Sequence, residues 1–206
     1  DAGHILINGT DVTKMPEFKR AKFLGRVFQD PMMGTAATME IAENLALAAR
    51  RGERRGLSKG INRKELEEYR ELLAMLDLGL EDRLTSKVGL LSGGQRQAVT
   101  LLMATLKRPK LLLLDEHTAA LDPKTAAKVL ETTNKIVTKD HLTTLMITHN
   151  MRDAIVNGNR LIMMSNGKII LDISGEEKKR LTVDDLLQKF AVASGEKFDD
   201  DRTLLS

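Results

Sequence analysis

Three short segments between Leu91 and Asp122 decide how this chain folds. They read LSGGQRQ at residues 91–97, LLLLDE at residues 111–116 and ALD at residues 120–122. The four leucines follow Pro109-Lys110. A short apolar run after a helix-breaking residue is typical of a strand buried on both faces, as in parallel sheets. The segments therefore predict an α/β fold with a buried central strand.

Two carboxylates, Asp115 and Glu116, come directly after this predicted strand. In open α/β sheets, ligands bind beyond the carboxyl ends of the strands. In P-loop NTPases an acid at this place helps to hold Mg²⁺. The neighbouring glutamate points the other way off the strand and can take a proton from attacking water. A strand end with two solvated acids is the simpler alternative, and this pair of residues by itself favours it.

Ser92 precedes two glycines and a helical pattern that begins at about Gln95. Serine is a good N-cap, so a capped helix with a tight entry is one explanation. The other is that the bare amides of Gly93 and Gly94, at the positive end of a helix, face a phosphate. Neither explanation excludes the other.

The order of these segments resembles the ABC ATPase family, the ATP-binding subunits of ABC transporters. Two further segments support the resemblance. VFQDP at residues 27–31 resembles the glutamine loop of that family, and LMITH at residues 145–149 resembles its switch-histidine strand. The resemblance covers about residues 1–172. It implies an α/β fold with a RecA-like P-loop NTPase core and the helical subdomain of the ABC family.

The resemblance also implies a site that binds ATP and Mg²⁺ and is shared by two head-to-tail subunits. The expected catalytic residues are Glu116, His149 and Gln29. The expected nucleotide contacts are Ser92, Gly93, Gly94, Gln95 and Asp122. The expected metal ligands are Asp115 and Gln29. Asp122 also has a structural explanation, since Asp122-Pro123 is a good helix start.

The phosphate-binding loop of the family is not found in this sequence. No Gly-x-x-x-x-Gly-Lys-Ser/Thr pattern occurs in the 206 residues, and this pattern supplies the amides and the lysine that hold the phosphates. The apolar strand predicted at residues 4–9 is the one that follows that loop in the family. The expected fold is therefore N-terminally truncated, and we expect residues 1–206 alone not to bind ATP in the usual way. Either the loop precedes Asp1 or it is absent.

The resemblance divides the chain into four segments. Residues 1–34 form the end of a β-subdomain and the first core segment, and residues 35–91 form the helical subdomain. Residues 92–172 form the RecA-like core, and residues 173–206 form a C-terminal helix and tail.

Local patterns predict the ends of individual elements. Strands are expected at residues 23–29 and 143–148, the second one buried, and a hairpin is expected at residues 160–165 and 168–173 around Asn166-Gly167. The expected N-caps are Thr38, Asn62 with Glu65 in a capping box, and Thr182, and the expected C-terminal cap is Gly79.

The basic residues 50–64 are expected to be a solvated loop, with phospholipid contact as the alternative. The acidic residues from Gly195 onward are expected to lack fixed structure. No role is predicted for His4, His117 or His141.

Composition narrows the class of protein. The chain is 42% hydrophobic with 3% aromatic residues, no Trp and no Cys, and its net charge is +3. So few aromatic residues argue against a stacking surface for single-stranded nucleic acid. Without cysteine there is no disulfide and no thiolate metal site. No apolar run is long enough to span a bilayer, so work at a membrane requires docking onto another subunit.

The resemblance to the ABC ATPase family implies a transporter ATPase subunit, peripheral on the cytoplasmic face of the membrane. The expected partners are a second ATPase subunit, identical or paired, the membrane permease and a solute-binding protein, and no nucleic acid. The short separation between Gln29 and Leu91 leaves no space for a long coiled-coil insertion. DEHTAALD at residues 115–122 resembles bacterial uptake systems, of the amino-acid type. Two alternatives stay open: a non-catalytic interaction or regulatory module, and a permease-free ABC protein associated with nucleic acid. The solute and the direction of transport are not encoded in this subunit.

Overall fold

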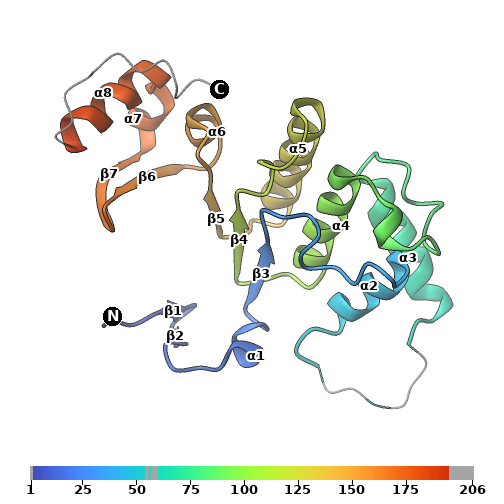
Figure 1. Ribbon diagram of the computed structural model, residues 1–206. Coiled ribbons are helices and arrows are strands. Elements are labelled where there is room, and N and C mark those ends of the chain that lie inside the picture. The colour runs from blue at the N-terminus through green and yellow to red at the C-terminus, as the bar shows by residue number, and fades with distance from the viewer. Residues whose placement is uncertain (1, 54–55, 57–59, 195–206) are drawn as a thin grey trace. The chain divides into compact units, whose positions relative to one another are not determined.

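The computed structural model describes residues 2–53, 56 and 60–194. The chain divides into two compact units, Asp1–Ile147 and Thr148–Ser206. Figure 1 labels the helices and strands of both units. Each unit is described below by itself, and the four-segment division remains a prediction.

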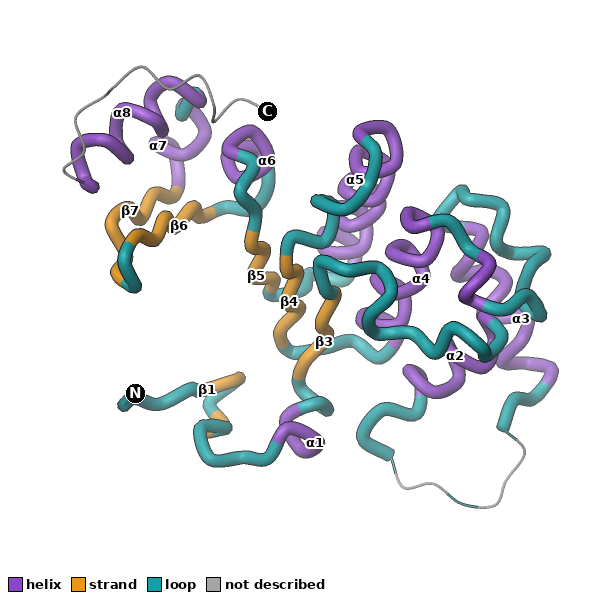
Figure 2. Tube along the Cα trace, viewed as in Figure 1, coloured by secondary structure: helices purple, strands orange, loops and turns teal. Residues whose placement is uncertain are grey.

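A three-stranded parallel sheet forms the centre of the first unit. It contains β3 (Leu24–Val27), β4 (Leu111–Asp115) and β5 (Thr144–Ile147), in the order β3-β4-β5. Figure 2 shows these strands side by side. Because all three run in one direction, their carboxyl ends lie at the same edge of the sheet. The predicted α/β fold is confirmed.

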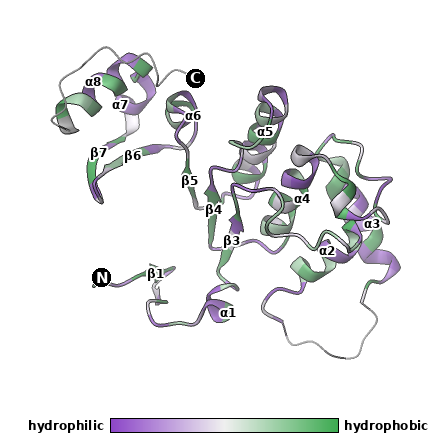
Figure 3. Cartoon of the chain, in the orientation of Figure 1, coloured by the Kyte–Doolittle hydropathy of each residue, from purple (hydrophilic) through white to green (hydrophobic). Residues whose placement is uncertain are grey.

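The predictions that β4 is buried on both faces and that β5 is a buried strand are wrong. In β4, Leu112 and Leu114 are buried, but Leu111 and Leu113 are only partly buried. In β5, Leu145 is 52% exposed and Ile147 is 51% exposed. The hydropathy colouring in Figure 3 shows β4 and β5 mainly in green, as apolar strands. Such alternation means that only one face of the sheet is fully covered in the described part of this unit.

Helix α4 (Gly93–Leu106) is shared by the two hydrophobic clusters of the first unit. Its Val99 belongs to the cluster formed with α2 (Ile41–Ala49) and α3 (Arg63–Ala74). Its Leu101 belongs to the cluster that covers the sheet. The helix therefore joins the helical part of the unit to the strands.

The strand β3 approaches α4 unusually closely at Gly25. A Cβ atom at this position would lie 2.5 Å from the backbone oxygen of Ala104. Only glycine permits this spacing between the strand and the helix.

The helix ends test the predicted caps. Asn62 caps α3, since the Glu65 amide donates to Asn62 Oδ1 at 2.9 Å and the Asn62 amide donates to Glu65 Oε2 at 2.8 Å. The predicted cap Thr38 is wrong, because α2 begins after Glu40, which forms a capping box with Glu43.

The predicted C-terminal cap Gly79 is also wrong. Helix α3 ends at Ala74, and its C-cap is Met75. Gly79 lies farther along the chain, with φ +64°. It therefore supports a later left-handed turn.

The smaller elements of the first unit lie near its N-terminus and before α4. They are β1 (Leu6–Ile7), β2 (Thr10–Asp11), α1 (Glu17–Arg20) and a 3₁₀ helix (Val88–Leu90). The predicted strand at residues 4–9 is the first arm of the β1–β2 hairpin, whose turn residues Asn8 and Gly9 have φ of 49° and 75°.

Two arginines of the basic run at residues 50–64 form contacts within the protein, so this run is not a purely solvated face. Arg50 Nη2 lies 2.7 Å from Glu65 Oε1. Arg51 Nη2 donates to the carbonyl of Lys107 at 2.8 Å, at the C-terminal end of α4, where unpaired helix carbonyls need donors. Arg54, Arg55 and Lys59 lie outside the described residues.

The second unit is a hairpin packed with three helices. Its elements are α6 (Met151–Val156), β6 (Arg160–Ser165), β7 (Lys168–Ser174), α7 (Gly175–Arg180) and α8 (Val183–Ser194). The predicted hairpin is confirmed, with Asn166 at φ 47° and Gly167 at φ 73°. Thr182 caps α8, since its Oγ1 accepts from the Asp185 amide at 3.1 Å. The predicted tail from Gly195 lies outside the described residues.

Neither unit holds, among its described helices, one that is both long enough and apolar enough to cross a membrane.

Gly94 lies where α4 meets α5 (Pro123–Lys139). Gly94 is buried, and a Cβ atom added to it would lie 1.8 Å from Thr125 Cγ2. The glycine is therefore required by packing within the chain, whatever else it contacts.

We predict that Gly94→Ala lowers the free energy of unfolding by about 1–3 kcal/mol, because the new methyl group overlaps Thr125. Chemical denaturation measures the change. The matched variant is Gly94→Ala with Thr125→Ser, which removes Cγ2 and should restore most of the stability. An equal loss in both variants would contradict the packing explanation.

Candidate functional site

Two predicted site residues, 87 positions apart, meet at the carboxyl edge of the sheet. Gln29 Nε2 donates a hydrogen bond of 3.0 Å to Glu116 Oε2. Gln29 follows the end of β3 at Val27, and Glu116 follows the end of β4 at Asp115. Adjacent parallel strands thus place the amide and the carboxylate together, as ligand sites in α/β folds require.

Glu116 has an uncommon backbone conformation, with φ +43°. For a residue other than glycine, such a conformation costs of order 1–3 kcal/mol and is concentrated at functional sites. Two backbone hydrogen bonds hold it. The Glu116 amide donates to the carbonyl of Ile147 at 3.0 Å, and its carbonyl accepts from the Ala119 amide at 2.9 Å. The carboxylate therefore leaves the strand in a set direction.

Asp115 is paired with a residue that the sequence analysis missed. Arg26 Nη2 lies 3.1 Å from Asp115 Oδ2, with the two side chains 52% and 38% exposed. The Arg26 guanidinium also lies 4.4 Å from the ring centre of Phe28. A pair this exposed contributes about 0–1 kcal/mol and can be exchanged for another cation. The signal in the sequence was a charged residue inside an apolar strand.

The predicted signature residues Ser92 and Gln95 bond to each other. Ser92 Oγ accepts from the Gln95 amide at 3.3 Å, and Gln95 Oε1 accepts from the Ser92 amide at 3.2 Å. Gln95 Nε2 also donates to the carbonyl of Leu78 at 3.3 Å. The capped-helix explanation is thus confirmed. Gly93 is exposed, whereas Gly94 is buried, so the two glycines differ in what they can offer a ligand.

Asp122 caps α5 as expected, with Pro123 at the first helical position. The Thr125 amide donates to Asp122 Oδ1 at 3.1 Å. Hydrogen bonds from the side chain and the backbone of Thr125 lower the pKa of Asp122. The carboxylate is exposed, so capping leaves it accessible to solvent.

His149 belongs to the second unit, in the link between β5 and α6. Its side chain is exposed. The structure therefore brings together Gln29, Asp115 and Glu116 from the first unit. The predicted role of His149 remains a prediction.

The residues around Asp115 do not form a metal cage by themselves. Within residues 2–53, 56 and 60–194, no group of three or more His, Cys, Asp or Glu side chains could hold a metal ion. A cation at Asp115 would need most of its ligands from water or a substrate.

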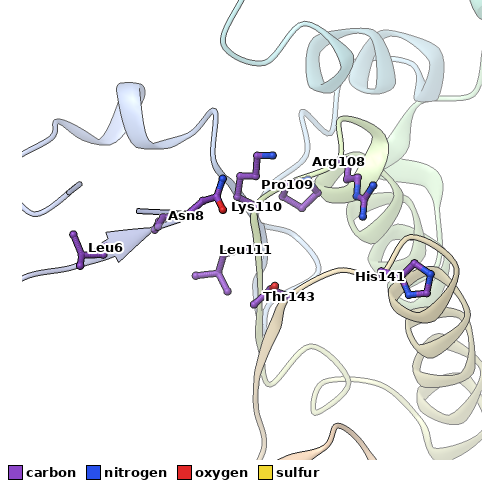
Figure 4. Close-up of a pocket in the computed structure, with 9 residues that line it drawn as sticks. Leu6, Asn8, Arg108, Pro109, Lys110, Leu111, His141 and Thr143 are labelled. Atoms are coloured by element: carbon purple, nitrogen blue, oxygen red, sulfur yellow. The ribbon is translucent and has the colours of Figure 1, made fainter. Parts of the chain in front are cut away.

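The first unit also contains a cavity of about 480 Å³, which is separate from the residues described above. Figure 4 shows its lining, which includes Asn8, Lys110 and His141. Lys110 precedes β4, so the cavity lies at the amino end of the strands, opposite to Glu116. None of the predicted site residues lines it, and it is not the candidate site.

A buried histidine lies directly after Glu116. His117 is 2% exposed, and its Nε2 lies 3.1 Å from Thr133 Oγ1 on α5. The Thr133 hydroxyl already donates to the carbonyl of Val129 at 2.8 Å. It can therefore only accept from His117, which assigns the ring proton to Nε2. Burial lowers the pKa of His117 to about 4.

Comparison with known proteins gives a family match. The family model described as ABC transporter matches residues 1–119. A tyrosine transport ATP-binding protein of Clostridioides difficile (strain R20291) is 46% identical over 192 residues, covering 93% of this chain and 76% of that protein. A methionine import ATP-binding protein, MetN of Rhizobium johnstonii, is 36% identical over 173 residues, covering 82% of this chain and 45% of that protein.

A solved structure agrees with the sequence relatives. The ATP-binding cassette MJ0796, a dimer in a post-hydrolysis state bound to ADP and Pi, has a TM-score of 0.69 and 26% identity. The match covers 84% of this chain and 73% of that one.

We predict that His117 makes the fold sensitive to acid. Its pKa falls from 6.5 in the unfolded chain to about 4 in the folded one. Between these values the unfolded chain binds a proton that the folded chain does not, so stability falls as the pH drops from about 6.5 to about 4, by up to about 3 kcal/mol. Denaturation across this range should show a smaller loss for His117→Gln, which keeps an amide donor for Thr133 and does not titrate. Identical pH profiles for both proteins would refute this assignment.

Proposed function

Because this chain belongs to the ABC transporter family, as one of its ATP-binding and ATP-hydrolysing subunits, we propose that it drives uptake of an amino acid through a membrane permease. The observation that carries the catalytic part of the proposal is the hydrogen bond between Gln29 Nε2 and Glu116 Oε2. The two relatives named for tyrosine transport and methionine import support the choice of solute class.

We propose that Glu116 polarises the water that attacks ATP. A carboxylate accepts hydrogen bonds only, and Gln29 holds one of its oxygens. This contact orients the carboxylate, which would accept a hydrogen bond from the attacking water. His149 is proposed to contact the γ-phosphate or the same water as a hydrogen-bond donor.

We propose that Mg²⁺ is held by Asp115 and Gln29. Mg²⁺ prefers oxygen ligands, retains several waters and commonly uses one or two carboxylates together with substrate phosphates. A site without a three-residue cage among the described residues fits this preference. Since Gln29 Nε2 faces Glu116, the metal would use Gln29 Oε1, and it would replace the exposed contact of Asp115 with Arg26. The ion supplies charge stabilisation at the phosphate oxygens.

We propose that two such subunits pair head to tail, with Ser92, Gly93, Gly94 and Gln95 of one facing the nucleotide of the other. The exposed Gly93 at the start of α4 supports this, because helix amides bind phosphate. Asp122 would lie at the contact between subunits. A two-fold pair makes two equivalent sites. The relative bound to ADP and Pi is dimeric, which supports the pairing of two subunits.

We propose that the permease docks near the Gln29 loop, at the cytoplasmic face of the membrane, and that a solute-binding protein delivers the amino acid. Met32 and Met33 follow Gln29 and are 62% and 52% exposed. Exposed methionines adapt well to an apolar partner surface.

Glu116→Gln in the natural gene product, assembled with its permease, is expected to reduce ATP turnover by about 10² to 10⁴, the usual effect of losing a general base. ATP-bound dimer should then accumulate in size-exclusion chromatography. The matched control is Glu131→Gln on α5, which removes a carboxylate exposed to solvent and should hydrolyse ATP normally. Unchanged turnover in Glu116→Gln would refute its catalytic role.

Deleting the gene from its host is expected to reduce uptake of one radiolabelled amino acid by about tenfold or more. We would compare tyrosine and methionine first. The wild-type gene should restore uptake and the Glu116→Gln gene should not, because uptake requires hydrolysis. Normal uptake of every amino acid, or purification of the protein with RNA and without a permease, would contradict the proposal.

A further inference from the structure

The side chain of Gln97 joins the two segments that carry Gln29 and Glu116. Gln97 lies on α4 and is fully buried. Its Nε2 donates to the carbonyl of Phe28 at 2.8 Å and to the carbonyl of His117 at 2.7 Å. Phe28 directly precedes Gln29, and His117 directly follows Glu116. One amide group therefore contacts the backbone on both sides of the contact between Gln29 and Glu116.

The other end of this amide has an energetic cost. Gln97 Oε1 is buried and has no hydrogen-bond partner within the described part of the protein. Leaving such an oxygen unpaired costs about 1–3 kcal/mol. An apolar residue at this position would avoid that loss but would leave the carbonyls of Phe28 and His117 without this donor. Rotating the amide by 180° would set its oxygen against two carbonyls, so the orientation is determined.

The turn that receives the second hydrogen bond needs support. Glu116 has φ +43°, and His117 is fixed to α5 through Thr133. Gln97 adds a contact from α4 to the same turn. A backbone conformation of this kind persists only when its surroundings impose it.

In the described part of the chain, the neighbouring residue Arg96 contacts only the loop after Gln29, and not the turn at Glu116 and His117. Arg96 Nε donates to Thr35 Oγ1 at 2.7 Å, and Nη2 donates to the carbonyl of Met32 at 3.1 Å. The loop after Gln29 therefore has a second attachment to α4. Of these two residues only Gln97 reaches both segments, so its loss should change their relative position.

We propose that Gln97 is a positioning residue for ATP hydrolysis. Its Nε2 sets the separation between the Gln29 and Glu116 segments, so that the two side chains stay in contact. Its side chain is fully buried, so it acts on the reaction only through these two segments. This inference rests on the proposed catalytic role of Glu116.

The test uses Gln97→Met in the natural gene product, assembled with its permease, with kcat and KM measured for ATP and Mg²⁺. Methionine has the same length and removes both donors. We expect kcat to fall by about tenfold or more, because displacing a catalytic group by about 1 Å costs up to 10²-fold. KM should stay within about threefold, because Gln97 does not contact ATP. A loss of folded protein would also lower the apparent kcat at an unchanged KM, so kcat is calculated per folded protein, with the folded fraction taken from the melting curve.

The matched control is Thr105→Val on the same helix. Thr105 is buried, and its hydroxyl bonds only to carbonyls of α4 itself, at 2.9 Å and 3.2 Å. This variant removes a buried polar group without reaching the site, and should keep the wild-type kcat. A kcat for Gln97→Met within twofold of the Thr105→Val value would overturn the proposal.

If Gln97→Met does not fold, a second variant, Gln97→Glu, tests the positioning role of Gln97. The charged carboxylate would face two carbonyl oxygens, whereas the protonated form can donate to one of them, and burial raises the pKa of such an acid. Its kcat relative to the wild type should rise as the pH falls from about 8 to about 6. Glu116 is present in both proteins, so it does not change this ratio. The pKa of His117 is about 4, below this pH range, so His117 does not change the ratio either. A constant ratio would overturn the proposal.

Glu116→Gln, measured alongside, separates this inference from the proposed function. If Glu116→Gln hydrolyses ATP at the wild-type rate, the proposed function is wrong and the inference fails with it. If Glu116→Gln is inactive while Gln97→Met keeps its kcat, only the role of Gln97 is wrong.

Discussion

The hydrogen bond between Gln29 and Glu116 depends on one constraint, the parallel pairing of β3 with β4. Parallel pairing brings the carboxyl ends of the two strands to one edge, where both side chains leave the sheet. The register places Val27 opposite Leu114, so Gln29 and Glu116 lie two residues beyond that pair on their strands. A hairpin of the same two strands would have sent them to opposite edges of the sheet. The site is thus a direct product of the α/β topology.

Helix α4 fixes this edge from one side. Its apolar residues join the helical cluster and the sheet cluster, and its polar residues Arg96 and Gln97 bond the backbone beside the site. Buried polar groups are expensive unless they are paired, and Gln97 leaves one oxygen unpaired. The strained Glu116 and the neutral, buried His117 add further local costs. These unfavourable free-energy terms all lie next to Gln29 and Glu116, where the position of the side chains determines the geometry of the site.

Local signals in the sequence found the starts of four of the eight described α-helices, because a cap is formed by residues three apart on the chain. Asn62, Ser92, Asp122 and Thr182 were predicted and found as caps. Thr38 and Gly79 were wrong because a nearby residue made the better local contact, Glu40 with Glu43 in one case and an earlier helix end in the other. A charged residue inside an apolar strand marked Arg26, but neither its pairing with Asp115 nor that of Gln97 with His117 could be read from local pattern, since the partners lie far along the chain.

The sequence by itself determined the family, the order of the strands and helices, and the residue types at the strand ends, because these depend on short-range pattern and motif order. Only the tertiary structure decided which side chains meet. It showed that Gly94 is needed by Thr125, that β5 is covered on one face only, and that one amide on α4 bonds both segments of the site. These facts depend on distances between residues that no sequence spacing encodes, since they arise when the helix and the strands pack together.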